Sequence, residues 1–156
     1  MPEYDTGAWS LYSTGSSRHE STVSYHELLR DFLNSMCDRT QADVYCGTAT
    51  RFTEYESEPP VLALAAPKVR GGKTGTLRVR LSKISSVTVQ ITRGDSVVST
   101  HALGTIGYGL TRVHWKAPRR KGTYDVSVSA RDLNGNTADT AGTVEVLKPV
   151  KKRKRG

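Results

Sequence analysis

The feature that most constrains the fold is an alternation of apolar and polar residues in the second half of the chain. Seven short segments follow one another at intervals of about 8 to 14 residues, and most of them change character with a period of two. This pattern is typical of antiparallel strands with one buried face. It predicts an all-β, immunoglobulin-like sandwich over residues 61–148, with strands near 61–64, 77–81, 86–91, 97–100, 110–115, 124–130 and 143–147.

The predicted turns agree with these strands. Arg93-Gly94-Asp95-Ser96 separates two of them as a hairpin turn does, and Asn134-Gly135 carries the signal for positive φ angles. Trp115 before a basic loop, and Gly122-Thr123-Tyr124 at the start of the sixth strand, resemble bacterial immunoglobulin-like and fibronectin-type modules. This resemblance concerns the fold and implies little about function.

Residues 1–58 are predicted to form a helical segment, which makes the fold class of the whole chain α+β by segments. Ser24 and Glu27 fit a capping box, which predicts a helix from Tyr25 to Cys37. A second short helix or irregular segment is expected over 41–53, and the Pro59-Pro60 pair is expected to mark a domain boundary. The apolar stripe of the first helix is predicted to comprise Tyr25, Leu28, Leu29, Phe32, Leu33 and Met36.

Two cysteines, Cys37 and Cys46, lie at the end of this helix and shortly after it. A disulfide between them would stabilise the fold by roughly 2 to 3 kcal/mol, and the alternative is two free thiols. Two cysteines without paired histidines are too few for a zinc site, so we expect neither a metal nor a cofactor.

Charge divides the chain more sharply than any other property. Residues 1–60 hold ten acidic against four basic residues, whereas residues 61–148 hold five against fourteen. A basic tail (149–156), which we expect to be disordered, adds five more basic residues. The basic part should attract a polyanion, and we expect an anionic, uronate-containing polysaccharide. Nucleic acid is disfavoured, because the basic part has few exposed-looking aromatic residues and no recognition helix.

Neither a membrane span nor a signal peptide is predicted. No apolar run approaches the 18 to 20 residues of a membrane helix, and residues 1–10 lack the basic start and apolar middle of a signal peptide. We expect an extracellular or cell-surface location if the chain belongs to a longer exported protein.

One stretch resembles a known enzyme family. Tyr4-Asp5-Thr6-Gly7, then Tyr12, then the Tyr25-His26 pair at the start of a helix, are similar to the C-terminal catalytic segment of the D-glucuronyl C5-epimerases, over roughly residues 3–56. These enzymes invert C5 of glucuronate in a polysaccharide to give iduronate. The resemblance implies that Tyr12 and Tyr25 are catalytic, and that Tyr4, His26 and Arg18 bind substrate.

The resemblance also implies a fold for the first part of the chain, namely the end of an α/α-toroid-like catalytic domain. The family's catalytic domain is several times longer than residues 1–58, so we expect the chain to be inactive unless an upstream catalytic chain completes the site. The alternative is a non-catalytic immunoglobulin-like module that binds an anionic glycan or a cell surface.

Overall fold

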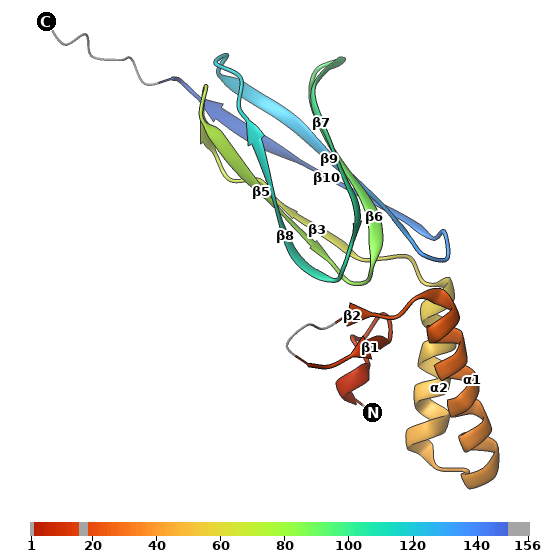
Figure 1. Ribbon diagram of the computed structural model, residues 1–156. Coiled ribbons are helices and arrows are strands. Elements are labelled where there is room, and N and C mark those ends of the chain that lie inside the picture. Colours follow the sequence, from red (N-terminus) through yellow and green to blue (C-terminus); the bar gives the residue numbers. More distant parts are fainter. Residues whose placement is uncertain (1, 16–18, 150–156) are drawn as a thin grey trace, which may run out of the picture.

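The computed structural model describes residues 2–15 and 19–149, which form a helical head and a β-sandwich joined end to end (Figure 1). The head consists of η1 (Pro2–Tyr4), β1 (Leu11–Ser13), β2 (His19–Glu20), α1 (Val23–Thr40) and α2 (Asp43–Ser57). The sandwich consists of β3 (Leu62–Ala65), β4 (Val69–Arg70), β5 (Thr74–Leu81), β6 (Ser85–Arg93), β7 (Ser96–Ile106), β8 (Gly109–Lys116), β9 (Gly122–Asp132) and β10 (Thr137–Leu147).

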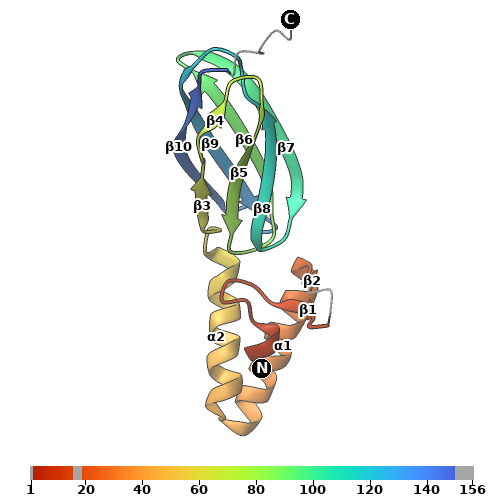
Figure 2. The same cartoon turned by 90° about the vertical axis from the view of Figure 1, so that its left-hand side faces the viewer.

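Two sheets pack face to face in the sandwich. One has the strand order β4-β10-β9-β6-β7, and the other has the order β3-β5-β8. All neighbouring strands are antiparallel except β4, which runs parallel to β10. In Figure 2 the three-stranded sheet faces the viewer, and the N-terminal segment lies below it on the same side. The predicted immunoglobulin-like sandwich is therefore confirmed, and each expected strand lies within or overlaps β3 or one of β5 to β10.

A tyrosine corner supports the immunoglobulin-like assignment. Tyr124 is buried at the start of β9, and its hydroxyl donates a hydrogen bond to the Arg120 carbonyl at 2.8 Å. Its ring lies near that of Trp115, with 6.4 Å between ring centroids. Alternate residues of β5, β6, β8, β9 and β10 fill the core between the sheets, which explains the period of two in the sequence.

The helices of the head are longer than the sequence predicts. Thr22, not Ser24, caps α1, since its side chain accepts a hydrogen bond from the Tyr25 amide. The C-cap of the helix is Gln41, which adopts the left-handed conformation (φ 52°). Its backbone N–H donates a hydrogen bond to the Cys37 carbonyl. Cys37 and Cys46 form a disulfide, so the alternative of two free thiols is wrong and the hairpin of α1 and α2 is covalently closed.

The predicted apolar stripe of α1 is only half right. Leu33 is fully buried between the helices, but Leu28 and Phe32 are 64% and 57% exposed. The buried face instead includes His26, which the apolar pattern could not include. Because α2 covers α1 from one side only, a stripe of six apolar residues is wider than the face that can be buried.

Lys83 joins the head to the sandwich. Its ammonium group is buried, and it donates to the Tyr55 carbonyl at 2.7 Å, to the Glu58 carbonyl, and to Asp132 Oδ2 at 2.7 Å. All three N–H donors of the lysine therefore have partners. Burial by itself would raise the pKa of Asp132, but the hydrogen bonds from Lys83 and Asn136 outweigh it and hold that pKa below its ordinary value.

Two further contacts fix the joint. Both carboxylate oxygens of Glu20 accept backbone amides of the sandwich, from Ile84 and Tyr108, each at 2.6 Å. On the opposite side, the Asn136 side chain donates to the Glu56 carbonyl at 2.8 Å. The end of α2 and the β1–β2 segment are thus held to the sandwich by independent hydrogen bonds, so the two parts behave as one unit.

Replacing Leu33 by Ala should lower the free energy of unfolding by about 2 to 5 kcal/mol, because it leaves a cavity between α1 and α2. Phe32→Ala is the matched control one residue away, and it should cost about 0.5 kcal/mol or less, as exposed substitutions do. Denaturant unfolding of both variants tests which face of α1 is buried. Equal losses would contradict the observed burial.

Lys83→Met should lower the free energy of unfolding by about 3 to 5 kcal/mol, because Asp132 would remain buried without its cation. The double variant Lys83→Met/Asp132→Asn should recover part of this loss. Lys68→Met removes an exposed lysine that pairs with Glu145, and it should leave the melting temperature nearly unchanged. A Lys83 variant as stable as the Lys68 variant would show that the joint does not depend on this ammonium group.

Candidate functional site

The stretch from Asp5 to Trp9 forms a tight turn that carries the candidate site. Asp5 Oδ1 accepts the Gly7 amide at 2.8 Å, and Thr6 Oγ1 accepts the Trp9 amide at 2.9 Å. Gly7 has a φ of +84°, a conformation that favours glycine. The residue types of Asp5-Thr6-Gly7 are therefore explained by local geometry, and the turn directs Trp9 into the interior.

Trp9 is the centre of the head. Its indole N–H donates to the Ser21 carbonyl at 2.8 Å, and its ring stacks on His26 with 3.8 Å between centroids and 6° between planes. Phe52 lies on the His26 ring with a centroid distance of 5.0 Å. The Lys83 ammonium lies 5.6 Å from the Trp9 ring centroid. This stack ties the N-terminal turn, both helices and the sandwich together.

His26 is a buried structural residue. Its Nε2 lies 2.8 Å from the Phe52 carbonyl, which can only accept, so Nε2 carries the hydrogen. Its Nδ1 then accepts from the Ser10 hydroxyl at 2.8 Å. Burial lowers the pKa of His26, which favours this neutral form. Both ring nitrogens are occupied, so this side chain offers nothing to a ligand in this conformation.

Tyr12 and Tyr25 lie side by side at the surface. Their ring centroids are 4.8 Å apart and the rings meet edge to face at 67°. Tyr12 is 61% exposed on β1, and Tyr25 is 36% exposed on the first turn of α1. Two residues that are thirteen positions apart in the sequence thus form one exposed pair.

Of the other predicted site residues, neither Tyr4 nor His26 places its side chain beside the Tyr12–Tyr25 pair. Tyr4 is partly exposed at the end of η1, and within residues 2–15 and 19–149 its ring makes no aromatic contact with Tyr12 or Tyr25. Arg18, predicted to bind substrate, lies outside the described residues. His26 follows Tyr25 in the chain but points inward, because successive helix positions face different directions.

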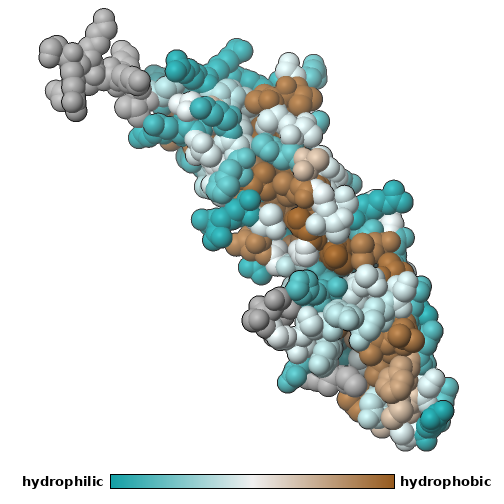
Figure 3. Space-filling view, viewed as in Figure 1, coloured by the Kyte–Doolittle hydropathy of each residue, from teal (hydrophilic) through white to brown (hydrophobic). Residues whose placement is uncertain are grey.

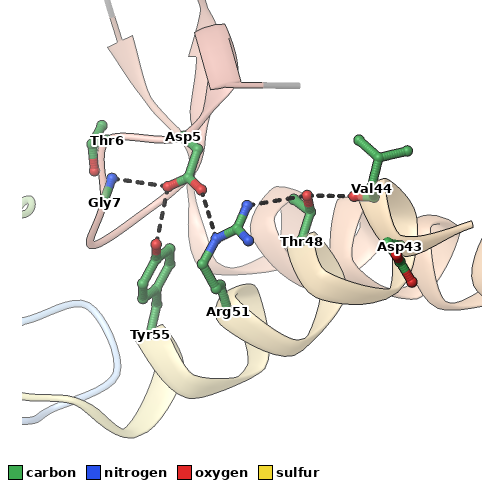
Figure 4. A pocket seen from close by; sticks show the side chains of 8 residues that line it. All are labelled: Asp5, Thr6, Gly7, Asp43, Val44, Thr48, Arg51 and Tyr55. Atoms are coloured by element: carbon green, nitrogen blue, oxygen red, sulfur yellow. Dashed lines mark hydrogen bonds and ion pairs between the residues drawn. The ribbon is translucent and has the colours of Figure 1, made fainter.

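A second cluster was not predicted from the sequence. Asp5 accepts the Tyr55 hydroxyl at 3.1 Å and pairs with Arg51 Nε at 3.2 Å (Figure 4). These residues line an open depression of about 510 Å³, together with Thr6, Gly7, Asp43, Val44 and Thr48. The available signal was the spacing of Arg51 and Tyr55, four residues apart and therefore on one face of α2.

Arg51 and Tyr55 stabilise the turn through their contacts with Asp5, and these contacts occupy polar groups that a ligand would need. The guanidinium also donates to the Gly47 carbonyl and the Thr48 hydroxyl, so it is held on three sides. Burial and the nearby Asp5 carboxylate raise the pKa of Tyr55, which keeps its hydroxyl protonated as a donor to Asp5. The depression can offer hydrogen bonds, but its arginine is already neutralised by Asp5.

No group of three His, Cys, Asp or Glu side chains that could hold a metal ion occurs within the described ranges. Among the same residues, no helix is long and apolar enough to cross a membrane.

No protein family model and no curated protein matches the chain. Among solved structures, it is similar to an engineered protein (29% identity, TM-score 0.46); the match covers 56% of this chain and 20% of the engineered protein. It is also similar to the titin M3 domain (18%, TM-score 0.37), with 58% of this chain covering 97% of that domain. A non-cellulosomal cohesin from Archaeoglobus fulgidus is similar at 12% identity and a TM-score of 0.34, with 58% of this chain covering 93% of the cohesin. These scores are below 0.5 and carry no functional argument.

The buried neutral His26 makes the stability depend on pH. Its pKa is lower in the folded than in the unfolded chain, so its contribution is fully present above about pH 6.5 and declines as the pH falls toward the folded pKa. We expect the free energy of unfolding to fall over this range with a slope of at most about 1.4 kcal/mol per pH unit. His26→Phe should flatten the slope, because it removes the buried titrating group. An unchanged slope in His26→Phe would contradict the assignment.

Proposed function

We propose that this chain is the C-terminal part of a uronate C5-epimerase, which converts glucuronate to iduronate in a polysaccharide once an upstream catalytic chain completes the site. The observation that carries the proposal is the exposed Tyr12–Tyr25 pair. The two tyrosines that the family resemblance singles out come from different elements and yet meet at the surface.

The chemistry needs a base and an acid near C5. The C5 hydrogen lies α to the C6 carboxylate, so its removal places further negative charge on an enediolate that the site must stabilise. Proton return from the opposite face of the sugar ring inverts the centre. Tyrosine can take either role when the completed site adjusts its protonation.

The geometry of the pair indicates that the acid/base group for the other face of the sugar comes from another chain. With ring centroids 4.8 Å apart and in edge contact, Tyr12 and Tyr25 leave no room for a sugar ring between them. Both must therefore approach from one side, one as the acid/base group and the other as its support. The group for the opposite face, and cations for the enediolate, would come from the upstream chain.

An apolar face next to the tyrosines supports such a partner. Tyr25, Leu28 and Phe32 share the outer side of α1, and Tyr12 contacts the Tyr25 end of this row. Figure 3 shows exposed apolar surface over the helical part of the molecule. Since this row is continuous with the tyrosine pair, a chain that covers it would also reach the sugar bound there.

The direct test is deuterium exchange from heavy water into C5 of a glucuronate polymer. The chain is assayed alone and with the product of the gene that precedes its own. We expect exchange only in the mixture, and a loss of about 100-fold to 10,000-fold with Tyr25→Phe, the range for an acid/base group. Tyr12→Phe should also reduce exchange, by an equal or smaller factor.

Tyr45→Phe is the control, because Tyr45 packs against the core of the head, away from the exposed pair. It should leave the exchange rate unchanged. Absence of exchange in every mixture would overturn the proposal. So would exchange that is insensitive to both Tyr12→Phe and Tyr25→Phe.

A non-catalytic role is the second candidate, and the net charge of +9 on residues 61–148 favours it. In that case the sandwich binds an anionic glycan and the head only supports it. Glycan binding without exchange in any mixture would select this alternative.

A further inference from the structure

One outer face of the sandwich carries exposed cations and no acidic residue. On the three-stranded sheet, the outward positions of β5 and β8 carry Arg78, Arg80, Arg112 and Lys116, all exposed. None of the three strands β3, β5 and β8 contains an acidic residue. Successive outward residues on a strand lie about 6.6 to 6.8 Å apart, so these cations form a compact array.

The array includes a pairing that disfavours folding. Arg78 on β5 lies directly opposite Arg112 on β8 in the strand register, and like charges at such positions repel. Among the described residues, neither arginine forms an ion pair or a hydrogen bond through its side chain. A repulsive pair without a compensating acid on the same sheet is better explained by binding than by stability.

The outer face of the five-stranded sheet is different. The outward positions of β9 and β10 include three acids, Asp125, Asp139 and Glu145, and one arginine, Arg131. Lys68 pairs with Glu145, and β4 adds the exposed Arg70. Acidic and basic residues are therefore mixed on this face, whereas the outer face of β3-β5-β8 carries cations alone. An anionic chain would be attracted more strongly to the three-stranded sheet than to its opposite.

The basic face continues toward the head. Arg80 lines an open groove of about 310 Å³ that also contains Ala63 and Tyr108 from the sandwich and Thr6 and Gly7 from the head. Thr6 and Gly7 also border the depression around Arg51. In Figure 2 the three-stranded sheet and the N-terminal turn lie on the same side of the molecule. The groove thus extends the array across the joint.

We propose that the outer face of β3-β5-β8 binds an extended anionic polysaccharide, held by Arg78, Arg80 and Arg112 and led by the groove at Arg80 toward the head. A guanidinium group pairs with a carboxylate through two parallel hydrogen bonds, which suits the regularly spaced carboxylates of a polyuronate. The choice of a uronate polymer rests on the proposed function, whereas the location of the binding face does not.

Nucleic acid fits this face less well. Proteins that bind single strands combine cations with aromatic rings on which bases stack, and no Trp, Tyr or Phe occupies an outward position of β3, β5 or β8. Proteins that recognise duplex DNA place a helix or a β-ribbon in a groove, whereas this surface is the broad face of a sheet.

The test is binding of a fluorescent glucuronan to the intact chain and to the triple variant Arg78→Gln/Arg80→Gln/Arg112→Gln. We expect the triple variant to bind at least tenfold more weakly, while it melts at the same temperature or higher because the Arg78–Arg112 repulsion is removed. Wild-type binding should weaken as the salt concentration rises. Carboxyl-reduced glucuronan should not compete. This assay needs no upstream chain and no turnover, so it can fail while the exchange assay succeeds, and the reverse.

Two matched variants make the result specific. Arg131→Gln removes the same charge from the opposite face and should leave affinity within about twofold. Residues 150–156 of the predicted tail lie outside the described residues, and a variant with glutamine at the five basic positions of residues 151–155 tests whether the tail alone binds. Loss of binding in the tail variant, with full binding by the triple variant, would overturn the proposal. Tighter binding to a single-stranded or duplex oligonucleotide at equal salt would also overturn it, in favour of a nucleic-acid surface.

Discussion

The buried ammonium group of Lys83 is the interaction on which the arrangement of the molecule depends. It satisfies two carbonyls at the end of α2 and the carboxylate of Asp132 in the sandwich, and it lies near the ring of Trp9. A buried cation with all its donors used tolerates little displacement. It therefore couples the position of α2 and of the Trp9–His26 stack to the sandwich. The exposed tyrosine pair and the basic sheet consequently keep a fixed relation to each other.

This rigidity gives the sandwich a role beyond that of an attached module. The head is small, and Trp9, Leu33, Ala49, Phe52 and Tyr55 make up its buried apolar cluster. A disulfide and the contacts of Glu20 and Lys83 supplement that small core. The sandwich thus supports the surface on which Tyr12 and Tyr25 stand, and it offers a charged face on the side of the N-terminal turn. Under the proposed function, a long anionic polysaccharide would contact both parts at once.

The sequence predicted the sandwich better than the head, for a physical reason. In β5, β6, β8 and β9 the apolar residues, with the exception of Leu110, face the second sheet, so the period of two translates directly into burial. In α1 the apolar residues exceed what α2 alone can cover, which leaves Leu28 and Phe32 exposed, while His26 is buried because Ser10 and the Phe52 carbonyl satisfy its nitrogens. The Tyr12–Tyr25 contact joins β1 to α1, and the Asp5–Arg51–Tyr55 cluster spans 50 residues, so neither follows from local patterns.

The central claim is that Tyr12 and Tyr25 contact a uronate substrate. It is tested most directly by NMR of the chain with isotope-labelled tyrosine rings, titrated with a glucuronate oligosaccharide in the presence of the upstream chain. The account predicts that the ring signals of Tyr12 and Tyr25 shift together with oligosaccharide concentration, while those of buried Tyr124 stay in place. Saturation of binding without any change at Tyr12 and Tyr25 would contradict it.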